Sequence, residues 1–242
     1  DKTIRLRFSD EVLLLNGIIS PYVEGISDSE TVSLDENLST ALESALGKEN
    51  KIPVSIESNN EKSEIIIKLE ESTEIGKKYE FYGEVENKKG SSLLFSFFFT
   101  GYNSRVPALV FTEIKDAVSE KYGKEFVELY ALSDGNLAGL KISSTNDGEN
   151  NAFIFPAIEI SKGDFITVHY RKPQDSSGCI SELSGDKTLS TGSGSSDIAW
   201  DIWVENSDSR LGASQDVIVL ENPNTGKILQ SVLYSLDKKN EW

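Results

Sequence analysis

The stretch that decides the fold of this chain consists of VFTEI at residues 110–114 and KEFVELYALSDGNLAGLKI at residues 124–142. Both contain short runs in which apolar residues alternate with polar ones, and both runs end at turn-forming residues. In FVELY, for example, apolar residues flank Glu128. A period of two is typical of strands with one buried face, so this stretch predicts antiparallel β-strands.

Two later segments repeat the pattern. DFITVH at residues 164–169 places His169 on one face of a strand and Ile166 and Val168 on the other. Farther along, NPNTG at residues 222–226 separates two apolar runs and predicts a β-hairpin, because glycine tolerates the positive φ angle that such a turn needs. Together these segments predict an antiparallel β-sandwich.

The order and spacing of these segments resemble the lamin-tail domain, which is found at the end of nuclear lamins and in many bacterial secreted proteins. The resemblance covers about residues 107–236. Two positions depart from the family pattern: Leu140 stands where a Trp is usual, and Ala131 where an Asn is usual. The resemblance implies an immunoglobulin-like sandwich over residues 107–242 that offers interaction surfaces rather than a known reaction. The matching segments, in chain order, are Thr112–Ile114, Phe126–Tyr130, Leu137–Ile142, Phe155–Pro156, Ile160–Gly163, Phe165–Val168, Leu211–Gly212, Val217–Leu220, Asn222–Gly226 and Ile228–Tyr234.

Residues 1–103 have the pattern of a separate β domain with one helix. Ser33 is a natural N-cap and Gly47 a natural end for a helix over Leu34–Leu46. Residues 64–100, in which a Tyr-containing strand and a turn lead into a strand rich in Phe, resemble bacterial immunoglobulin-like domains. The predicted strands are Thr3–Phe8, Glu11–Leu15, Pro53–Glu57, Glu64–Leu69, Lys78–Val85 and Leu93–Thr100.

The predicted fold class is therefore all-β, with two immunoglobulin-like β-sandwiches, the first carrying one α-helix. The two are joined at residues 101–107. A chain of 242 residues with 38% hydrophobic residues is long and apolar enough for two buried cores. The second domain also contains a long Ser- and Gly-rich segment at residues 171–197. Its composition predicts a partly disordered loop or a flexible flap.

Composition excludes several classes of partner. The net charge is −16, which would be repelled by nucleic acid and by anionic membranes, so we expect neither partner. No apolar run is long enough to span a membrane. The chain begins at Asp1 and contains no Met, which is typical of a processed chain and fits an upstream signal sequence or lipid anchor.

The single cysteine, Cys179, rules out an internal disulfide. We expect it to be an incidental exposed thiol, with an intermolecular disulfide as the alternative. The single histidine, His169, is too few for a zinc centre, which needs several His or Cys ligands. The chain also lacks the G-x-S-x-G motif of a serine hydrolase. We therefore expect His169 to be a structural residue on a sandwich face.

The carboxylates do not predict an active site. Glu125 and Glu128 lie three residues apart on a predicted strand and point to opposite faces, so they cannot flank one glycosidic bond. Glu113 and Glu128 are expected to be framework residues. No acidic segment has the spacing of an EF-hand loop.

Asp197 with Asp201, and the turn at residues 146–148, are the first positions at which to look for a calcium ion. A solvated acidic surface is the favoured interpretation of both. We predict no metal, no cofactor and no catalytic residue.

Trp200 and Tyr170 are the predicted ligand contacts, because exposed aromatic rings on a sandwich stack on sugars or anchor a protein partner. Trp200 and Trp203 lie three residues apart, so in a strand they face opposite sides. We assign Trp203 to packing and Trp200 to the surface.

These observations favour a non-catalytic exported protein, in the periplasm or on the cell surface of a bacterium. It would act as an interaction or spacer module for an unidentified protein or glycan. Two alternatives stay open. One is a carbohydrate-binding module that uses exposed aromatic residues, and the other is a hydrolase with a carboxylate site.

Overall fold

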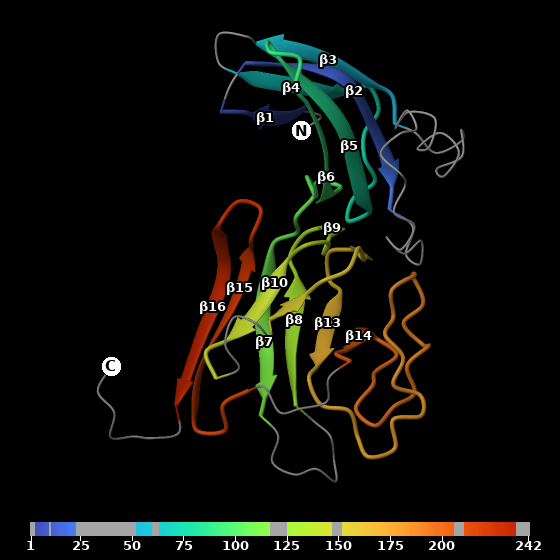
Figure 1. Cartoon of the computed structure of the whole chain (residues 1–242). Coiled ribbons are helices and arrows are strands. Elements are labelled where there is room, and N and C mark those ends of the chain that lie inside the picture. Colours follow the sequence, from blue (N-terminus) through green and yellow to red (C-terminus); the bar gives the residue numbers. More distant parts are fainter. Residues whose placement is uncertain are drawn as a thin grey trace. The chain divides into compact units, whose positions relative to one another are not determined.

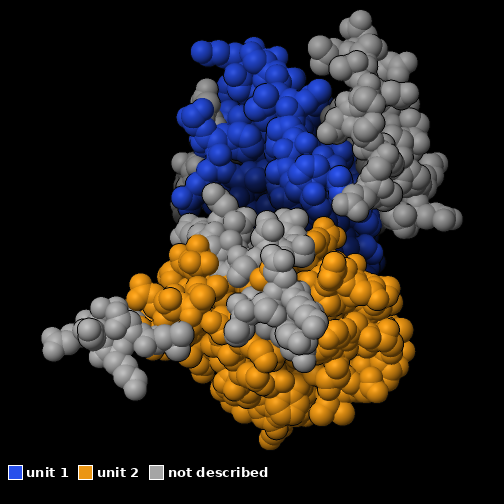
Figure 2. Space-filling view, turned by 90° about the horizontal axis from the view of Figure 1, so that it is seen from below, with its two compact units in different colours: residues 1–102 blue, residues 103–242 orange. Residues whose placement is uncertain are grey.

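A computed structural model describes residues 3–9, 11–22, 52–59, 63–116, 125–146, 152–205 and 211–235. The chain divides into two compact units, unit 1 at residues 1–102 and unit 2 at residues 103–242 (Figure 2). The described ranges contain strands and no α-helix, so the all-β class is confirmed for them. The helix expected over Leu34–Leu46 lies outside these ranges. The described part also has no helix that is long and apolar enough to cross a membrane.

Unit 1 has two three-stranded antiparallel sheets (Figure 1). Four apolar residues from both sheets, Ile19, Ile65, Ile67 and Phe81, are fully buried in one shared core. The first sheet has the order β1 (Thr3–Arg7), β4 (Glu64–Leu69), β3 (Val54–Asn59), and the second has the order β2 (Val12–Pro21), β5 (Lys78–Asn87), β6 (Ser92–Thr100).

Strand β2 is longer than the sequence pattern predicted. The prediction ended at Leu15, whereas the strand continues to Pro21. The pairing with β5 shifts register between Leu14 and Asn16, so a β-bulge absorbs the interruption in the apolar pattern. Beyond the bulge, a Cβ atom on Gly17 would lie 3.1 Å from the ring of Phe81. A small residue here leaves room for that core ring.

Unit 2 contains two four-stranded sheets and a short two-stranded one (Figure 1). The first sheet has the order β14 (Ala199–Trp203), β13 (Phe165–His169), β8 (Phe126–Ala131), β7 (Leu109–Lys115). The second has the order β11 (Phe153–Ile154), β10 (Lys141–Ser144), β15 (Gln215–Asn222), β16 (Lys227–Ser235). The two-stranded sheet pairs β9 (Gly135–Asn136) with β12 (Glu159–Ile160).

The core of unit 2 is built from alternate residues of the two larger sheets, as the period of two predicted. Ile166 and Val168 of β13 and Ile218 and Leu220 of β15 all have an exposed fraction of 0%. Two expected turns are also confirmed. Gly226 has a φ of 66° between β15 and β16, and Gly90 has a φ of 77° between β5 and β6. Glycine adopts this conformation without the steric cost of a Cβ.

One pairing in unit 2 is not antiparallel. Strands β13 and β14 are neighbours in the sheet and run parallel, with Phe165 opposite Ala199 and His169 opposite Trp203. Parallel neighbours need a connection that returns the chain to the same end of the sheet. Residues 170–198 form this connection, which we call the crossover. Figure 1 shows it as the gold and orange loops beside β13 and β14.

The partial disorder predicted for residues 171–197 is not found, and the flexible flap stays a prediction. The segment has a defined path that consists of turns and bends, and its backbone is hydrogen-bonded at Gly178, Thr191 and Gly192. Its low content of large apolar residues suggested disorder. The segment is ordered because buried polar side chains take the place of an apolar core.

Candidate functional site: the crossover and its buried polar network

Both faces of β13 and β14 are buried. Ile166, Trp200 and Ile202 point into the core between the two large sheets. His169 and Asp201 occupy the alternate positions, on the face away from that core, with exposed fractions of 1% and 0%. The burial of this second face follows from the crossover, whose residues contact it.

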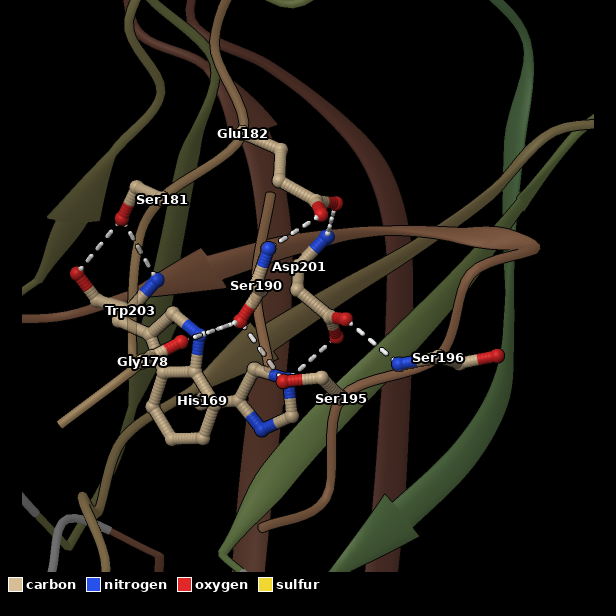
Figure 3. A network of polar contacts seen from close by, with 9 residues as sticks. All are labelled: His169, Gly178, Ser181, Glu182, Ser190, Ser195, Ser196, Asp201 and Trp203. Atoms are coloured by element: carbon tan, nitrogen blue, oxygen red, sulfur yellow. Dashed lines mark hydrogen bonds and ion pairs between the residues drawn. The ribbon is translucent and has the colours of Figure 1, made fainter. Parts of the chain in front are cut away.

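His169 and Asp201 form the centre of the buried network (Figure 3). The His169 Nε2 atom lies 2.7 Å from Asp201 Oδ1. A carboxylate oxygen accepts hydrogen bonds, so we assign the proton of this contact to Nε2. The imidazole stacks on the ring of Trp203, with centroids 3.9 Å apart and an interplanar angle of 10°. The other carboxylate oxygen, Asp201 Oδ2, accepts a hydrogen bond of 2.7 Å from the backbone amide of Ser196.

Glu182 lies in the crossover and is also fully buried. Its Oε1 accepts from the backbone amide of Ser190 at 3.0 Å, and its Oε2 accepts from the backbone amide of Asp201 at 2.8 Å. The Glu182 amide in turn donates to the Asp201 carbonyl at 2.9 Å. A buried carboxylate is costly unless it is hydrogen-bonded, and here both oxygens of each carboxylate have a donor.

Two serines complete the network. Ser190 Oγ accepts from Trp203 Nε1 at 2.8 Å and lies 2.7 Å from Ser195 Oγ. Ser181 Oγ accepts from the Trp203 amide at 2.9 Å and contacts the Trp203 carbonyl at 3.2 Å. With Glu182, Ser181 therefore occupies the outer hydrogen-bonding edge of β14. An edge covered in this way cannot pair with another strand.

A second anchor attaches the crossover to the turn before β13. Lys187 Nζ lies 2.6 Å from Asp164 Oδ1, and Trp200 Nε1 donates to Asp164 Oδ2 at 3.0 Å. Burial acts to raise the pKa of Asp164. The hydrogen bonds from Lys187, the Ser161 amide and Trp200 outweigh burial and lower that pKa below its usual value.

The contacts of this network hold the crossover in place. Among the described residues, no hydrogen bond joins His169 to a serine hydroxyl, so the network lacks the nucleophile–base contact of a serine hydrolase. The same residues contain no group of three or more His, Cys, Asp or Glu side chains that is placed to hold a metal ion. Each polar side chain of the network instead contacts another part of unit 2.

The predicted exposure of Trp200 and Tyr170 is wrong. Their exposed fractions are 5% and 4%, and both belong to the core between the sheets. Trp203 is buried as predicted, at 4%, but on the opposite face, beneath the crossover. The alternation that places the two tryptophans on opposite faces was therefore correct. It did not reveal that both faces are covered.

The paired acidic positions considered for calcium also do not converge. Asp197 is exposed, whereas Asp201 points inward to His169. The turn at residues 146–148 lies partly outside the described residues. Cys179 is half-buried rather than exposed, and burial raises the pKa of its thiol. A Cβ atom on Gly192 would lie only 2.5 Å from its Sγ, so this thiol packs inside the crossover.

The glutamates of the first strands have separate contacts. Glu125 is buried and accepts from the Leu211 amide at 2.7 Å, whereas Glu128 accepts from Thr112 Oγ1 at 2.6 Å. Glu113 is exposed and lies opposite Glu128 in the strand pairing. Glu125 therefore lies apart from Glu113 and Glu128, which are neighbours on one face of the sheet.

Sequence reasoning missed Glu182 and Ser190 altogether. Both are single polar residues in a Ser- and Gly-rich segment, where composition does not distinguish a buried carboxylate from a solvated one. The one available signal was the length of the segment between two strand patterns. A connection of this length is what a parallel crossover requires.

Comparisons with known proteins place unit 2 in a family. The chain is 33% identical over 137 residues to an uncharacterized protein of Treponema pallidum (strain Nichols), and the match covers 56% of this chain and 34% of that protein. The chain thus spans about a third of the length of this relative. No solved structure matches. A family described as "protein second domain" matches residues 107–242, which is more than half of the chain. The chain belongs to this family.

Proposed function

We propose that this chain is a non-catalytic interaction module and that the crossover is its contact surface. The proposal rests on the opposite placement of polar and apolar side chains within residues 171–198. The polar side chains Glu182 and Ser190 point inward and fix the loop. Four large apolar side chains of the same segment are exposed: Ile180 at 50%, Leu183 at 45%, Leu189 at 39% and Ile198 at 75%.

A loop of this kind is suited to binding for a physical reason. Exposed apolar side chains gain free energy when a partner removes them from water. A loop that is already ordered loses little conformational entropy on binding, so more of that gain appears as affinity. The buried network would therefore support binding indirectly, because it holds the exposed side chains in place.

The proposal also includes the fold family of each unit and the export of the protein. We infer that unit 2 is a lamin-tail-like sandwich and unit 1 a bacterial immunoglobulin-like one. The order of the strand segments and the facing sheets in each unit support this inference. We also propose that the protein is exported by a bacterium. The relative in Treponema pallidum supports a bacterial context, and protease treatment of intact cells tests export. Degradation is expected in intact cells or after the outer membrane alone is permeabilised, and protection under both conditions would contradict export.

The two alternative functions receive less support. Sugar binding was expected to occur by stacking on Trp200 and Tyr170, but both rings are buried in the core. A carboxylate hydrolase needs two acidic groups that face one open site. The two fully buried acids of the crossover face, Glu182 and Asp201, instead accept hydrogen bonds from backbone amides.

Site-specific photo-crosslinking tests the interaction surface. A photoreactive residue is placed at Ile198 in the full chain and expressed in the cells that normally make the protein. The matched control places it at Ile228, an apolar position of unit 2 that is 59% exposed on β16. We expect a discrete adduct with one partner from position 198 and none from position 228.

Competition then tests whether the adduct reports specific binding. Added wild-type protein should suppress the adduct, and the Ile198→Asp variant should compete at least tenfold less well, because the charge opposes burial of that position. Equal adducts from both positions, or none from position 198, would contradict the proposed surface.

A further inference from the structure

The edge strands of this protein are protected unequally. In unit 2, Ser181 and Glu182 cover the edge of β14. In unit 1, the edge strand β1 carries Arg5 and Arg7, which lie 3.7 and 3.5 Å from Glu64. Charges on an edge and covered edges are the usual means by which proteins prevent strands of separate molecules from pairing. The remaining edge strands can be compared with these two protected strands.

Strand β6 has none of these protections. It is the edge of the sheet β2-β5-β6, and its sequence SLLFSFFFT contains no charged residue and no proline. Its pairing with β5 runs from Ser92 to Thr100 without a register shift, so it carries no bulge. No other described segment pairs with its outer edge. This is a long and regular edge that is open to pairing within the described part of the chain.

Both faces of β6 carry large apolar side chains that are at least partly exposed. On the face away from the core, Leu94 is 41% exposed and Phe98 is 50% exposed. The ring of Phe98 is held there by an edge-on contact with Tyr22, with centroids 5.2 Å apart. On the other face, Leu93 is 55% exposed, and the partly buried Phe95, Phe97 and Phe99 extend the core to the edge.

The strand is also complementary to itself. If Ser96 is taken as a centre, the sequence has the same chemical character in both directions. Residues equally distant from Ser96 are then both hydroxylated or both apolar: Ser92 with Thr100, Leu93 with Phe99, Leu94 with Phe98, and Phe95 with Phe97. An antiparallel pair of identical strands brings such residues opposite one another.

We propose that two copies of this chain associate through β6, in an antiparallel pair with a twofold axis at Ser96. The pairing joins the two three-stranded sheets β2-β5-β6 into one continuous sheet. In this pairing of the two β6 strands, which we call the seam, every residue faces a residue of the same chemical character in the other copy. The backbone groups on the outer edge of β6 then become hydrogen-bonded. This surface belongs to unit 1 and is independent of the crossover.

The area and the charge of the seam set the strength of this dimer. The exposed apolar parts of β6 amount to on the order of 400 Å² per copy, which places the interface among weak and reversible ones. Each copy carries a net charge of −16, so the two copies repel one another although β6 itself contains no charged residue. Salt screens this repulsion, and the dimer should therefore become stronger as the ionic strength rises.

Sedimentation of the full chain over a range of concentrations tests the association. We expect a monomer–dimer equilibrium that shifts at least threefold toward dimer between about 0.05 M and about 0.5 M NaCl. Ser96→Lys places two like charges opposite each other at the axis and should weaken the dimer at least tenfold. Ser231→Lys changes an exposed serine on another long edge strand, β16, and should leave the equilibrium unchanged.

Cysteine cross-linking tests the register, in a Cys179→Ser background. Ser96→Cys brings the two new thiols opposite each other, where the Cα separation of an antiparallel pair permits a disulfide. In Leu94→Cys the two thiols lie four residues apart along the seam, roughly 14 Å, which is too far for a disulfide. We expect a disulfide-linked dimer from the first variant only.

Three results would overturn the proposal. The first is a chain that remains monomeric at every concentration and salt level. The second is a dimer that persists unchanged in Ser96→Lys, and the third is equal cross-linking of both cysteine variants. Circular dichroism of each variant confirms that it is folded, which is expected because Ser96 and Leu94 are exposed.

Discussion

The two faces of the sheet β14-β13-β8-β7 are both buried over β13 and β14, but different forces bury them. On the inner face, Ile166 and Ile202 pack among apolar side chains of the opposite sheet. On the outer face, His169 and Asp201 are covered by a crossover that is fixed by hydrogen bonds. Apolar packing tolerates small changes of shape, whereas a buried polar network loses much of its stability when one partner is removed.

The largest effect is expected from Asp201→Ala. The variant leaves the buried His169 Nε2 proton and the half-buried Ser196 amide without their acceptor, which should lower the free energy of unfolding by about 3–5 kcal/mol. Urea unfolding measures the loss, and hydrogen exchange should show faster exchange of the crossover amides. Asp197→Ala is the control, because this neighbouring aspartate is exposed and should change the free energy by less than about 0.5 kcal/mol. Similar losses in the two variants would show that the outer face is not sensitive to its polar contacts.

A smaller effect is expected from Gly192→Ala. The new methyl group would meet Cys179 Sγ at 2.5 Å, and such overpacking should cost about 1–3 kcal/mol. The double variant with Cys179→Ala removes the sulfur and should recover most of the loss. A double-mutant cycle of unfolding free energies measures the coupling. Additive effects would mean that these two residues do not compete for space.

Removal of one methylene group from the inner face should lower the free energy of unfolding less than Asp201→Ala does. Ile166→Val should cost about 1 kcal/mol in the free energy of unfolding, because the core loses one buried methylene. Unlike Asp201→Ala, it should not accelerate exchange of the crossover amides selectively. Selective opening of the crossover in this variant would contradict the separation of the two faces.

The smallest effect is expected on the stability of the protein at low pH. The pKa of Asp164 is lowered in the folded state, so its contribution to stability is present above the pKa of the unfolded chain, about 3.9, and is lost as the pH falls through the folded value. Asp164→Asn should therefore be less stable than the wild type at neutral pH, by no more than about 1 kcal/mol, and should lose less stability on acidification to about pH 3. Thermal unfolding as a function of pH measures both. An unchanged acid response would indicate that Lys187 and Trp200 do not hold this carboxylate in solution.

The sequence predicted those parts of the fold that depend on neighbouring residues. The alternation in FVELY and FITVH places Val127, Leu129, Ile166 and Val168 in the core, and all four are buried. The turn at residues 222–226 was predictable because glycine meets a local backbone requirement. Strand β2 was predicted too short, because its bulge is stabilised by pairing with β5, which lies far away in the sequence.

The candidate site was much less predictable. Alternation correctly separated Trp200 from Trp203, but it could not show that the outer face is covered, because the cover lies in residues 170–198. Polar residues that look solvated in sequence, such as Glu182, become buried when a distant strand supplies their hydrogen-bond partners. Composition alone therefore predicted disorder where the chain is ordered.

By itself, the sequence determined the all-β class, the positions of most described strands, and which residues of each strand share a face. These properties follow from the two-residue period of an extended backbone, which is local. Only the tertiary structure decided that β14 lies parallel to β13, that the crossover closes the outer face over His169 and Asp201, and that no other described segment pairs with the outer edge of β6. These features depend on which strands pair with one another, and pairing is determined by contacts between residues that are far apart in the chain.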